Sequence, residues 1–171
     1  MKNLSKSKFV SGIQCEKKLW FDFYRKDLKP EIDDQTQAVF DLGHRIGILA
    51  QEMFPNGKDA SPENYSNLKP SIDNTKKWIS EKVETIYEAT FTAKNAFCML
   101  DIVHRKDDEV WAIEVKSSTS VKDYHFTDAS LQYFVMKNAG SAPDRFFIMH
   151  INNQYVKQGE LTIELFTLTD I

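Results

Sequence analysis

Two apolar stretches, each interrupted by an acid, decide the fold: Phe97-Cys-Met-Leu-Asp-Ile-Val103 and Val110-Trp-Ala-Ile-Glu-Val-Lys116. Their β-branched, aromatic and other apolar residues favour strands. The polar link Lys106-Asp-Asp-Glu109 between them is short enough for an antiparallel hairpin. We therefore expect Asp101 and Glu114 to lie on adjacent strands.

Side chains alternate between the two faces of a strand, so Glu114 and Lys116 should project together with Ala112. A carboxylate and an ammonium on an apolar strand cost free energy to desolvate unless they have partners. Asp101 is likewise a lone acid in an apolar strand. Two acids from paired strands can converge on one hard cation such as Mg²⁺, which takes one or two carboxylates and completes its shell with water and phosphate. The alternative is a surface ion pair at a sheet edge, worth roughly 0–1 kcal/mol.

Helices are expected before the hairpin, and one helix with two strands after it. A first helix can be capped by Ser5 or Ser7, and residues 58–69 should form a surface loop. The other expected helices cover 15–25, 35–54, 72–83 and 127–139, the last closed by Gly140, and the other expected strands cover 85–92, 145–151 and 161–168. One helix between the hairpin and the later strands predicts an α/β fold with a central mixed sheet of about five strands flanked by helices.

Composition is that of one folded domain. The chain of 171 residues with 42% hydrophobic content can bury a single core, so we expect one domain over residues 1–171. Because no long apolar segment and no secretory signal pattern is present, the expected location is the cytoplasm, with no membrane partner. Cys15 and Cys98 should be reduced thiols. The last residues, 165–171, directly follow a strand-like run, which also fits a fragment of a longer protein whose further domains would be partners.

Basic residues are concentrated at one end of a chain whose net charge is −3. Residues 1–30 contain eight of the 22 Lys and Arg but only three of the 25 Asp and Glu. Lysines and arginines on one surface displace counterions from nucleic acid, so this segment suits an arm that contacts phosphates. A solvated helix face explains the same pattern equally well.

An acid in one strand, a hairpin, and Glu-Val-Lys in the next strand resemble the PD-(D/E)XK nuclease superfamily. More narrowly, the chain resembles the RecB-like branch, which includes CRISPR-associated RecB-like exonucleases and a related bacterial family. The matching segments are Leu4-Ser-Lys-Ser-Lys-Phe-Val-Ser-Gly-Ile-Gln-Cys15, Lys18-Leu-Trp20, Phe40-Asp-Leu-Gly-His44, Ile86-Tyr-Glu-Ala89, Leu100-Asp101, Ile113-Glu-Val-Lys-Ser-Ser118 and Gln132-Tyr133. The resemblance covers most of the chain and implies a restriction-endonuclease-like core.

This resemblance implies a role for each matching residue. Asp101 and Glu114 would bind Mg²⁺ or Mn²⁺, with His44 and the carbonyl of Val115 as further ligands. The remaining catalytic residues would be Lys116 and Gln132, the glutamine positioning the lysine or the substrate.

Several positions depart from the family pattern. Leu100 replaces the expected proline, and Met136 stands where a tyrosine should follow the glutamine, so the adjacent Tyr133 is a further candidate. Glu88 aligns with an acid that some members place near the metals, but it equally fits an exposed strand residue. The iron–sulfur members need four cysteines, and only Cys15 occupies a matching position, so no complete iron–sulfur site is expected.

His44 should lie off the main apolar stripe of its helix, near Gly43 and Gly47. Two glycines inside a helix cost roughly 1 kcal/mol each relative to alanine. Close approach of another backbone or of a ligand would account for that cost.

The expected function is therefore metal-dependent hydrolysis of phosphodiester bonds in DNA, as an exonuclease on single strands or duplex ends. One alternative is a catalytically inactive nuclease-fold module that binds nucleic acid or a partner protein. Another is a structural α/β domain whose acids and lysine merely pair on the surface.

Overall fold

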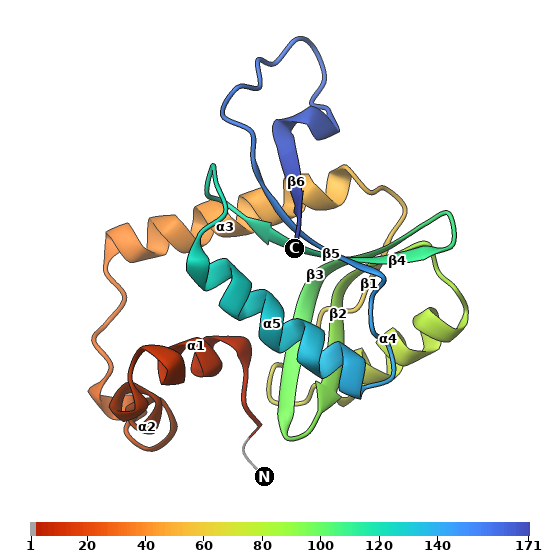
Figure 1. Ribbon diagram of the computed structural model, residues 1–171. Helices are drawn as coiled ribbons and strands as arrows, with labels where there is room; N and C mark the ends of the chain where they lie inside the picture. Colours follow the sequence, from red (N-terminus) through yellow and green to blue (C-terminus); the bar gives the residue numbers. More distant parts are fainter. Residues whose placement is uncertain (1–2) are drawn as a thin grey trace.

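The computed structural model describes residues 3–171 and has a mixed six-stranded sheet with helices on both faces (Figure 1). The helices are α1 (Lys6–Gln14), α2 (Glu16–Tyr24), α3 (Asp34–Glu52), α4 (Lys69–Ser80) and α5 (Asp123–Asn138), with short 3₁₀ turns η1 (Lys26–Leu28) and η2 (Ile163–Leu165). The strands are β1 (Lys58–Asp59), β2 (Thr85–Ala93), β3 (Ala96–Lys106), β4 (Glu109–Lys116), β5 (Arg145–Ile151) and β6 (Phe166–Asp170). The predicted α/β class is confirmed.

The strands lie in the sheet in chain order, from β1 to β6. Strands β2, β3 and β4 form an antiparallel meander, and the hairpin expected between β3 and β4 is present. Strand β5 runs parallel to β4, because α5 carries the chain back across the sheet between them. Strand β1 is parallel to β2, and β6 is antiparallel to β5. This combination gives the mixed sheet that the single connecting helix predicted.

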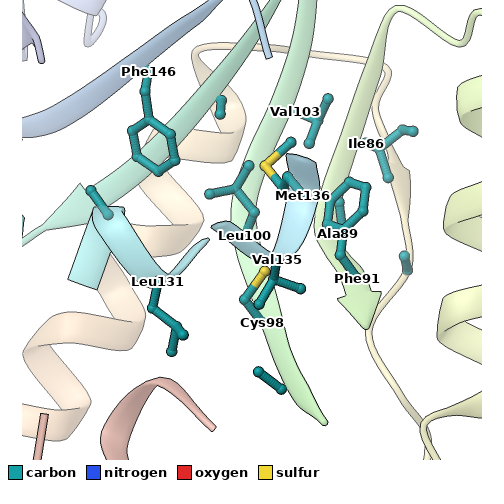
Figure 2. Packing of buried hydrophobic residues seen from close by; sticks show 14 of the residues in the cluster. Ile86, Ala89, Phe91, Cys98, Leu100, Val103, Leu131, Val135, Met136 and Phe146 are labelled. Atoms are coloured by element: carbon teal, nitrogen blue, oxygen red, sulfur yellow. The ribbon is translucent and has the colours of Figure 1, made fainter. Parts of the chain in front are cut away.

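Two apolar clusters fill the spaces between the sheet and the helices. The larger cluster lies under α5, with contributions from α4 and α1; Figure 2 labels its members Ile86, Ala89, Phe91, Cys98, Leu100, Val103, Leu131, Val135, Met136 and Phe146. The second lies under α3, where Ala50 packs against Ile102, Ile113 and Met149. We refer to these as the α5 face and the α3 face of the sheet. Fully burying one such side chain contributes about 1.5–3 kcal/mol, so both helices are held mainly by these contacts.

Several element boundaries differ from the sequence predictions, and α4, expected over 72–83, covers Lys69–Ser80. Residues 58–69 are not entirely a loop, because Lys58 and Asp59 pair with β2. Helix α5 begins at Asp123 rather than 127, since the backbone N–H of Lys122 donates to Nδ1 of His125 (3.2 Å) and fixes an earlier first turn. The last strand begins at Phe166 rather than 161, because residues 163–165 form the 3₁₀ turn η2.

Local predictions at the ends of α1 and α5 are confirmed. Ser5 is the N-cap of α1, its hydroxyl accepting from the backbone N–H of Lys8 (3.4 Å). Gly140 follows α5 with a φ of +79°, the left-handed geometry that suits glycine at a helix end. Both Cys15 and Cys98 are free thiols, and burial raises the pKa of Cys98 to about 12. Across residues 3–171, no helix combines the length and the apolar character needed to cross a membrane.

Candidate active site

Three acids lie side by side on three neighbouring strands. The register between β2 and β3 places Glu88 opposite Asp101. The register between β3 and β4, continued by one residue, places Asp101 beside Glu114. We call Glu88, Asp101 and Glu114 the acidic row. Such a row brings like charges together in the middle of a sheet, which is unfavourable unless cations or protons compensate it.

The backbone is irregular at the acidic row. Leu100 and Ile102 would share a face in a regular strand, yet Leu100 packs on the α5 face and Ile102 on the α3 face. On the facing strand, Glu88 has a φ of 51°, a left-handed conformation that costs free energy for a residue with a Cβ. In both strands, therefore, the alternation of side chains between the two faces of the sheet is reversed at this point. The row sits where the regular pairing of the sheet is interrupted.

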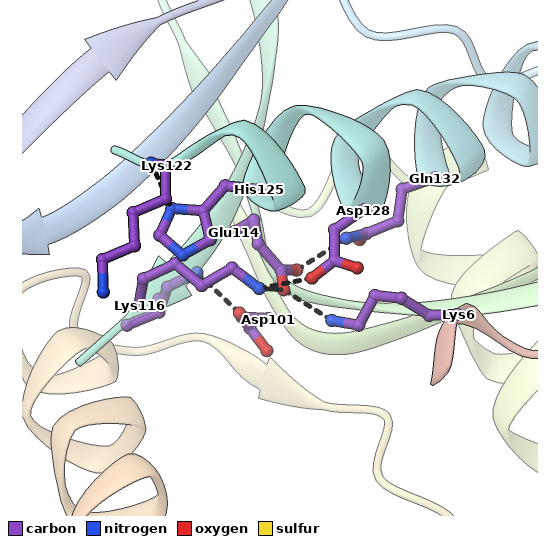
Figure 3. Close-up of polar contacts among 9 residues, drawn as sticks. Lys6, Asp101, Glu114, Lys116, Lys122, His125, Asp128 and Gln132 are labelled. Carbon is purple, nitrogen blue, oxygen red and sulfur yellow. Dashed lines mark hydrogen bonds and ion pairs between the residues drawn. The ribbon is translucent and has the colours of Figure 1, made fainter. Parts of the chain in front are cut away.

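Glu114 lies at the centre of the polar contacts drawn in Figure 3. The residue is buried, with only 1% of its surface exposed. Its Oε1 accepts from the ammonium groups of Lys6 (2.5 Å) and Lys116 (2.8 Å). Its Oε2 accepts from Nε2 of Gln132 (2.8 Å). The alternative of a surface ion pair is therefore wrong for Glu114, because a buried carboxylate with three donors is an internal polar network.

Lys116 is held between two carboxylates. Besides Glu114, its Nζ donates to Oδ2 of Asp128 on α5 (2.7 Å). Asp128 and Gln132 are four residues apart and therefore lie on the same side of α5, together with His125. All three are buried, so this side of the helix presents a polar stripe to Glu114 and Lys116. Lys116 lies beside Glu114, as the strand alternation predicted, whereas Gln132 contacts Glu114 rather than the lysine.

Asp101 fills the position where the ladder between β3 and β4 stops. Its Oδ2 accepts from the backbone N–H of Val115 (2.6 Å), which a continued ladder would have paired with backbone. That bond occupies one carboxylate oxygen and leaves Oδ1 for another ligand. The Val115 side chain packs on the α3 face, and a ligand role for its carbonyl stays a prediction.

The pKa values reflect uneven neutralisation of the acids. Burial opposes ionisation of Glu114, but Lys6 and Lys116 outweigh it and lower its pKa to about 2. Burial and the negative charge of Glu114 instead raise the pKa of Asp101. The pKa of Glu88 rises to about 7, through burial and then the charges of Asp59 and Glu114. The site therefore holds more carboxyl groups than its two ammonium groups can neutralise, and the raised pKa values favour protonation of Asp101 and Glu88.

Two other predicted site residues, His44 and Tyr133, have no described hydrogen bond or ion pair with the acidic row. His44 is exposed on α3, and no described hydrogen bond or ion pair joins it to the acidic row. Tyr133 is 41% exposed, and the ammonium of Lys137 lies 5.9 Å from its ring centroid. Within residues 3–171, no three His, Cys, Asp or Glu side chains are already arranged to hold a metal ion.

The two glycines near His44, Gly43 and Gly47, are not closely approached by a neighbouring segment. A Cβ added at Gly43 or at Gly47 would meet nothing within 4 Å. Close approach of another backbone is therefore the wrong explanation for these two glycines. Glu88, by contrast, is half-buried rather than an exposed strand residue.

Sequence reasoning missed Lys6, Asp128, His125 and Asp59. Asp128 and His125 had a signal, because with Gln132 they form a polar stripe at positions i, i+3 and i+7 of the helix, the spacing of residues that share one face. His125, which no motif marked, is buried in the first turn of α5 on the same side as Asp128 and Gln132. Lys6 lies in one of the segments that match the family, but nothing in the sequence placed it at Glu114, because the two residues are 108 positions apart and only the tertiary fold brings them together.

Comparison with known proteins adds information on the fold. No family model matches the chain, and no curated sequence matches it. The crystal structure of SSO0001 superposes with a TM-score of 0.54 and 12% sequence identity, over 99% of this chain and 67% of that one. At this identity the likeness supports the α/β architecture alone.

Proposed function

We propose that the protein is a nuclease dependent on Mg²⁺ or Mn²⁺ that hydrolyses phosphodiester bonds in DNA. The observation that carries this proposal is the acidic row with Lys116 beside it, inside an otherwise apolar sheet. The same residues carry the resemblance to the PD-(D/E)XK superfamily. An apolar sheet gains no stability from three adjacent acids, because desolvating them costs more than their pairing returns.

The residues fit a hard divalent cation. Asp101 and Glu114 supply carboxylate oxygens, the ligand type that Mg²⁺ and Mn²⁺ favour, and Glu88 stands beside them. Oε1 of Gln132 is buried without a hydrogen-bond partner among the described residues, so a water bound at the site would find an acceptor there. The raised pKa values of Asp101 and Glu88 also indicate room for additional positive charge. When bound, such a cation lowers the pKa of a coordinated water and neutralises phosphate charge.

Each protein group then has a definite task. Lys116, fixed between Glu114 and Asp128, presents its ammonium to the oxygens of the attacked phosphate. Burial would lower the pKa of Lys116, but the negative charge of Glu114 raises it overall, so the side chain stays protonated and acts by charge. Gln132 keeps Glu114 oriented through Oε2. Preorganised charge of this kind stabilises the transition state of phosphoryl transfer.

The N-terminal helices offer a surface for a polyanion. Helices α1 and α2 and turn η1 line an open pocket of about 1070 Å³. Its basic lining residues are Lys8, Lys17, Lys18, Arg25, Lys26 and Lys29, against one acid, Asp22. Exposed Trp20 and Tyr24 on α2 could stack on unpaired bases. We therefore favour single-stranded DNA or duplex ends as substrate. We keep the exonuclease mode and the cytoplasmic location as proposals that rest on the sequence.

A catalytically inactive module that binds nucleic acid or a partner protein is the second candidate. One observation favours it: the ammonium of Lys6 already neutralises Glu114 without any metal. Such a module would keep the basic pocket and bind DNA without cleaving it.

Substitution of Lys116 separates these two functions. We expect Lys116→Met to lower the rate of Mn²⁺-dependent DNA cleavage by about 10²–10³-fold, because the charge presented to the phosphate is lost. Mn²⁺ binding should persist, because the carboxylates of Asp101 and Glu114 are retained. The control Lys76→Met removes an exposed lysine from α4 and should cleave at the wild-type rate. Cleavage is followed on end-labelled single-stranded and duplex DNA. Equal rates for Lys116→Met and wild type would refute the assigned role.

A further inference from the structure

The sequence motifs assigned no role to Lys6, yet its ammonium contacts the centre of the site. Its ammonium lies 2.5 Å from Oε1 of Glu114, and the negative charges of Asp101 and Asp128 also act on it. These include the two carboxylates proposed to bind the cation. A positive group of the chain itself therefore occupies the place where a divalent ion would coordinate.

Glu114 has little capacity left for another ligand. A carboxylate oxygen has two lone pairs, and on Oε1 both are directed to ammonium groups, from Lys6 and Lys116. Gln132 uses one lone pair of Oε2. A metal that binds through Oε1 must displace one of the two lysines.

Of the two, Lys6 is the one able to leave. Lys116 has a second anion in Asp128 and is 16% exposed, whereas the Lys6 side chain is 31% exposed. Its ammonium sits on a flexible four-carbon stem that can rotate toward solvent. The helix itself stays in place, because Leu4 is hydrogen-bonded to Asn95 and Phe97, and Phe9 packs into the core. Release therefore requires only rotation of one side chain.

We infer that Lys6 is a built-in competitor of the divalent cation: its ammonium neutralises Glu114 in the metal-free protein and is displaced when Mg²⁺ or Mn²⁺ binds. The inference rests on the proposed metal site and adds a residue that sets its affinity. If the lysine-bound form makes up about 90% of the metal-free protein, the apparent metal affinity is weakened about tenfold.

The test is calorimetric titration of Mn²⁺ alone into the full chain and its variants. Lys6→Met should bind Mn²⁺ about tenfold more tightly than wild type, because no side chain has to be displaced. Lys6→Arg keeps a cation that can pair with Glu114 and should remain within about twofold of wild type or bind more weakly. Lys8→Met removes one charge from the same helix, where that ammonium lies over the Phe23 ring, and should change the affinity less than about twofold.

Each outcome decides the inference. Equal or weaker Mn²⁺ binding by folded Lys6→Met, with wild type still binding, overturns it and leaves the proposed nuclease intact. If Lys8→Met raises the Mn²⁺ affinity as much as Lys6→Met does, the inference is overturned too. Loss of any positive charge on the helix would then explain the tighter binding. Absence of Mn²⁺ binding in every variant overturns both proposals. Should Lys6→Met fail to fold, the Lys6 side chain of wild type can be probed by reductive methylation, whose rate is expected to rise with saturating Mn²⁺; an unchanged rate contradicts displacement.

Discussion

Glu114 is an ionised group in a place where desolvation alone would keep a carboxyl protonated. Lys6, Lys116 and Gln132 together reverse that preference. Its neighbours in the acidic row have less compensation, and the pKa of Glu88 rises to about 7. Adjacent carboxylates with divergent pKa values are typical of sites that bind a cation or move a proton. At the residue scale, this imbalance is the strongest sign of function.

Glu88 should make stability depend on pH. Its pKa is raised by burial and by Asp59 and Glu114, whereas the unfolded chain titrates near the ordinary value of 4.5. Between these values the folded state binds the extra proton, so the associated stability is complete below pH 4.5 and is lost as pH rises through 7. Glu88→Gln stays neutral and should exceed wild type by on the order of 2 kcal/mol at pH 8 in EDTA, with little difference near pH 4.5. Urea unfolding at both pH values measures this.

Glu63→Gln is the matched control, because Glu63 is exposed in the segment before α4. It should change stability by less than about 0.5 kcal/mol at either pH. An equal gain of Glu88→Gln at both pH values would mean that folding does not raise the pKa of the Glu88 carboxyl.

At the scale of elements, local sequence patterns were sufficient for most helices and strands. The turn Lys106–Glu109 and the alternation around Glu114 predicted the hairpin and the face of Lys116, since strand geometry has a fixed period of two. The polar stripe of α5 could have been predicted from the helical period in the same way, although only Gln132 was. The reversal of strand faces at Asp101 was not, because it depends on the left-handed backbone of Glu88 and the pairing of both strands.

Helix α3 offers a test at this scale. An added Cβ at Gly43 meets nothing within 4 Å, so Gly43→Ala should stabilise the protein by up to about 1 kcal/mol through helix propensity alone. Gly57 gives the opposite case, because its Cβ would lie 2.3 Å from Cζ of Tyr87, and alanine there should destabilise by about 1–3 kcal/mol. Thermal unfolding of both variants measures the two signs. Destabilisation by Gly43→Ala would show that α3 approaches a neighbour at that point.

The whole molecule assembles its site from segments far apart in the chain. Strands β2, β3 and β4 supply the acidic row, α5 supplies Asp128 and Gln132, and α1 supplies Lys6. The sequence predicted the sheet and the hairpin acids because these depend on nearby residues. It could not predict Lys6 at Glu114, since that contact exists only after α1 packs beside α5 (Figure 1). His44 lies on α3, apart from these segments, and its role as a metal ligand stays a prediction.

The most direct test of the central claim is Mn²⁺-dependent cleavage of end-labelled DNA by wild type and Asp101→Asn. Wild type is expected to cleave single strands or duplex ends in Mn²⁺ and to stop in EDTA. Asp101→Asn should lose at least about 100-fold in rate, because a carboxylate that we propose binds the metal becomes a neutral amide. Asp108→Asn, an exposed acid in the β3–β4 turn, should match wild type. Cleavage that survives EDTA, equal rates in wild type and Asp101→Asn, or no cleavage by the folded protein would contradict the account.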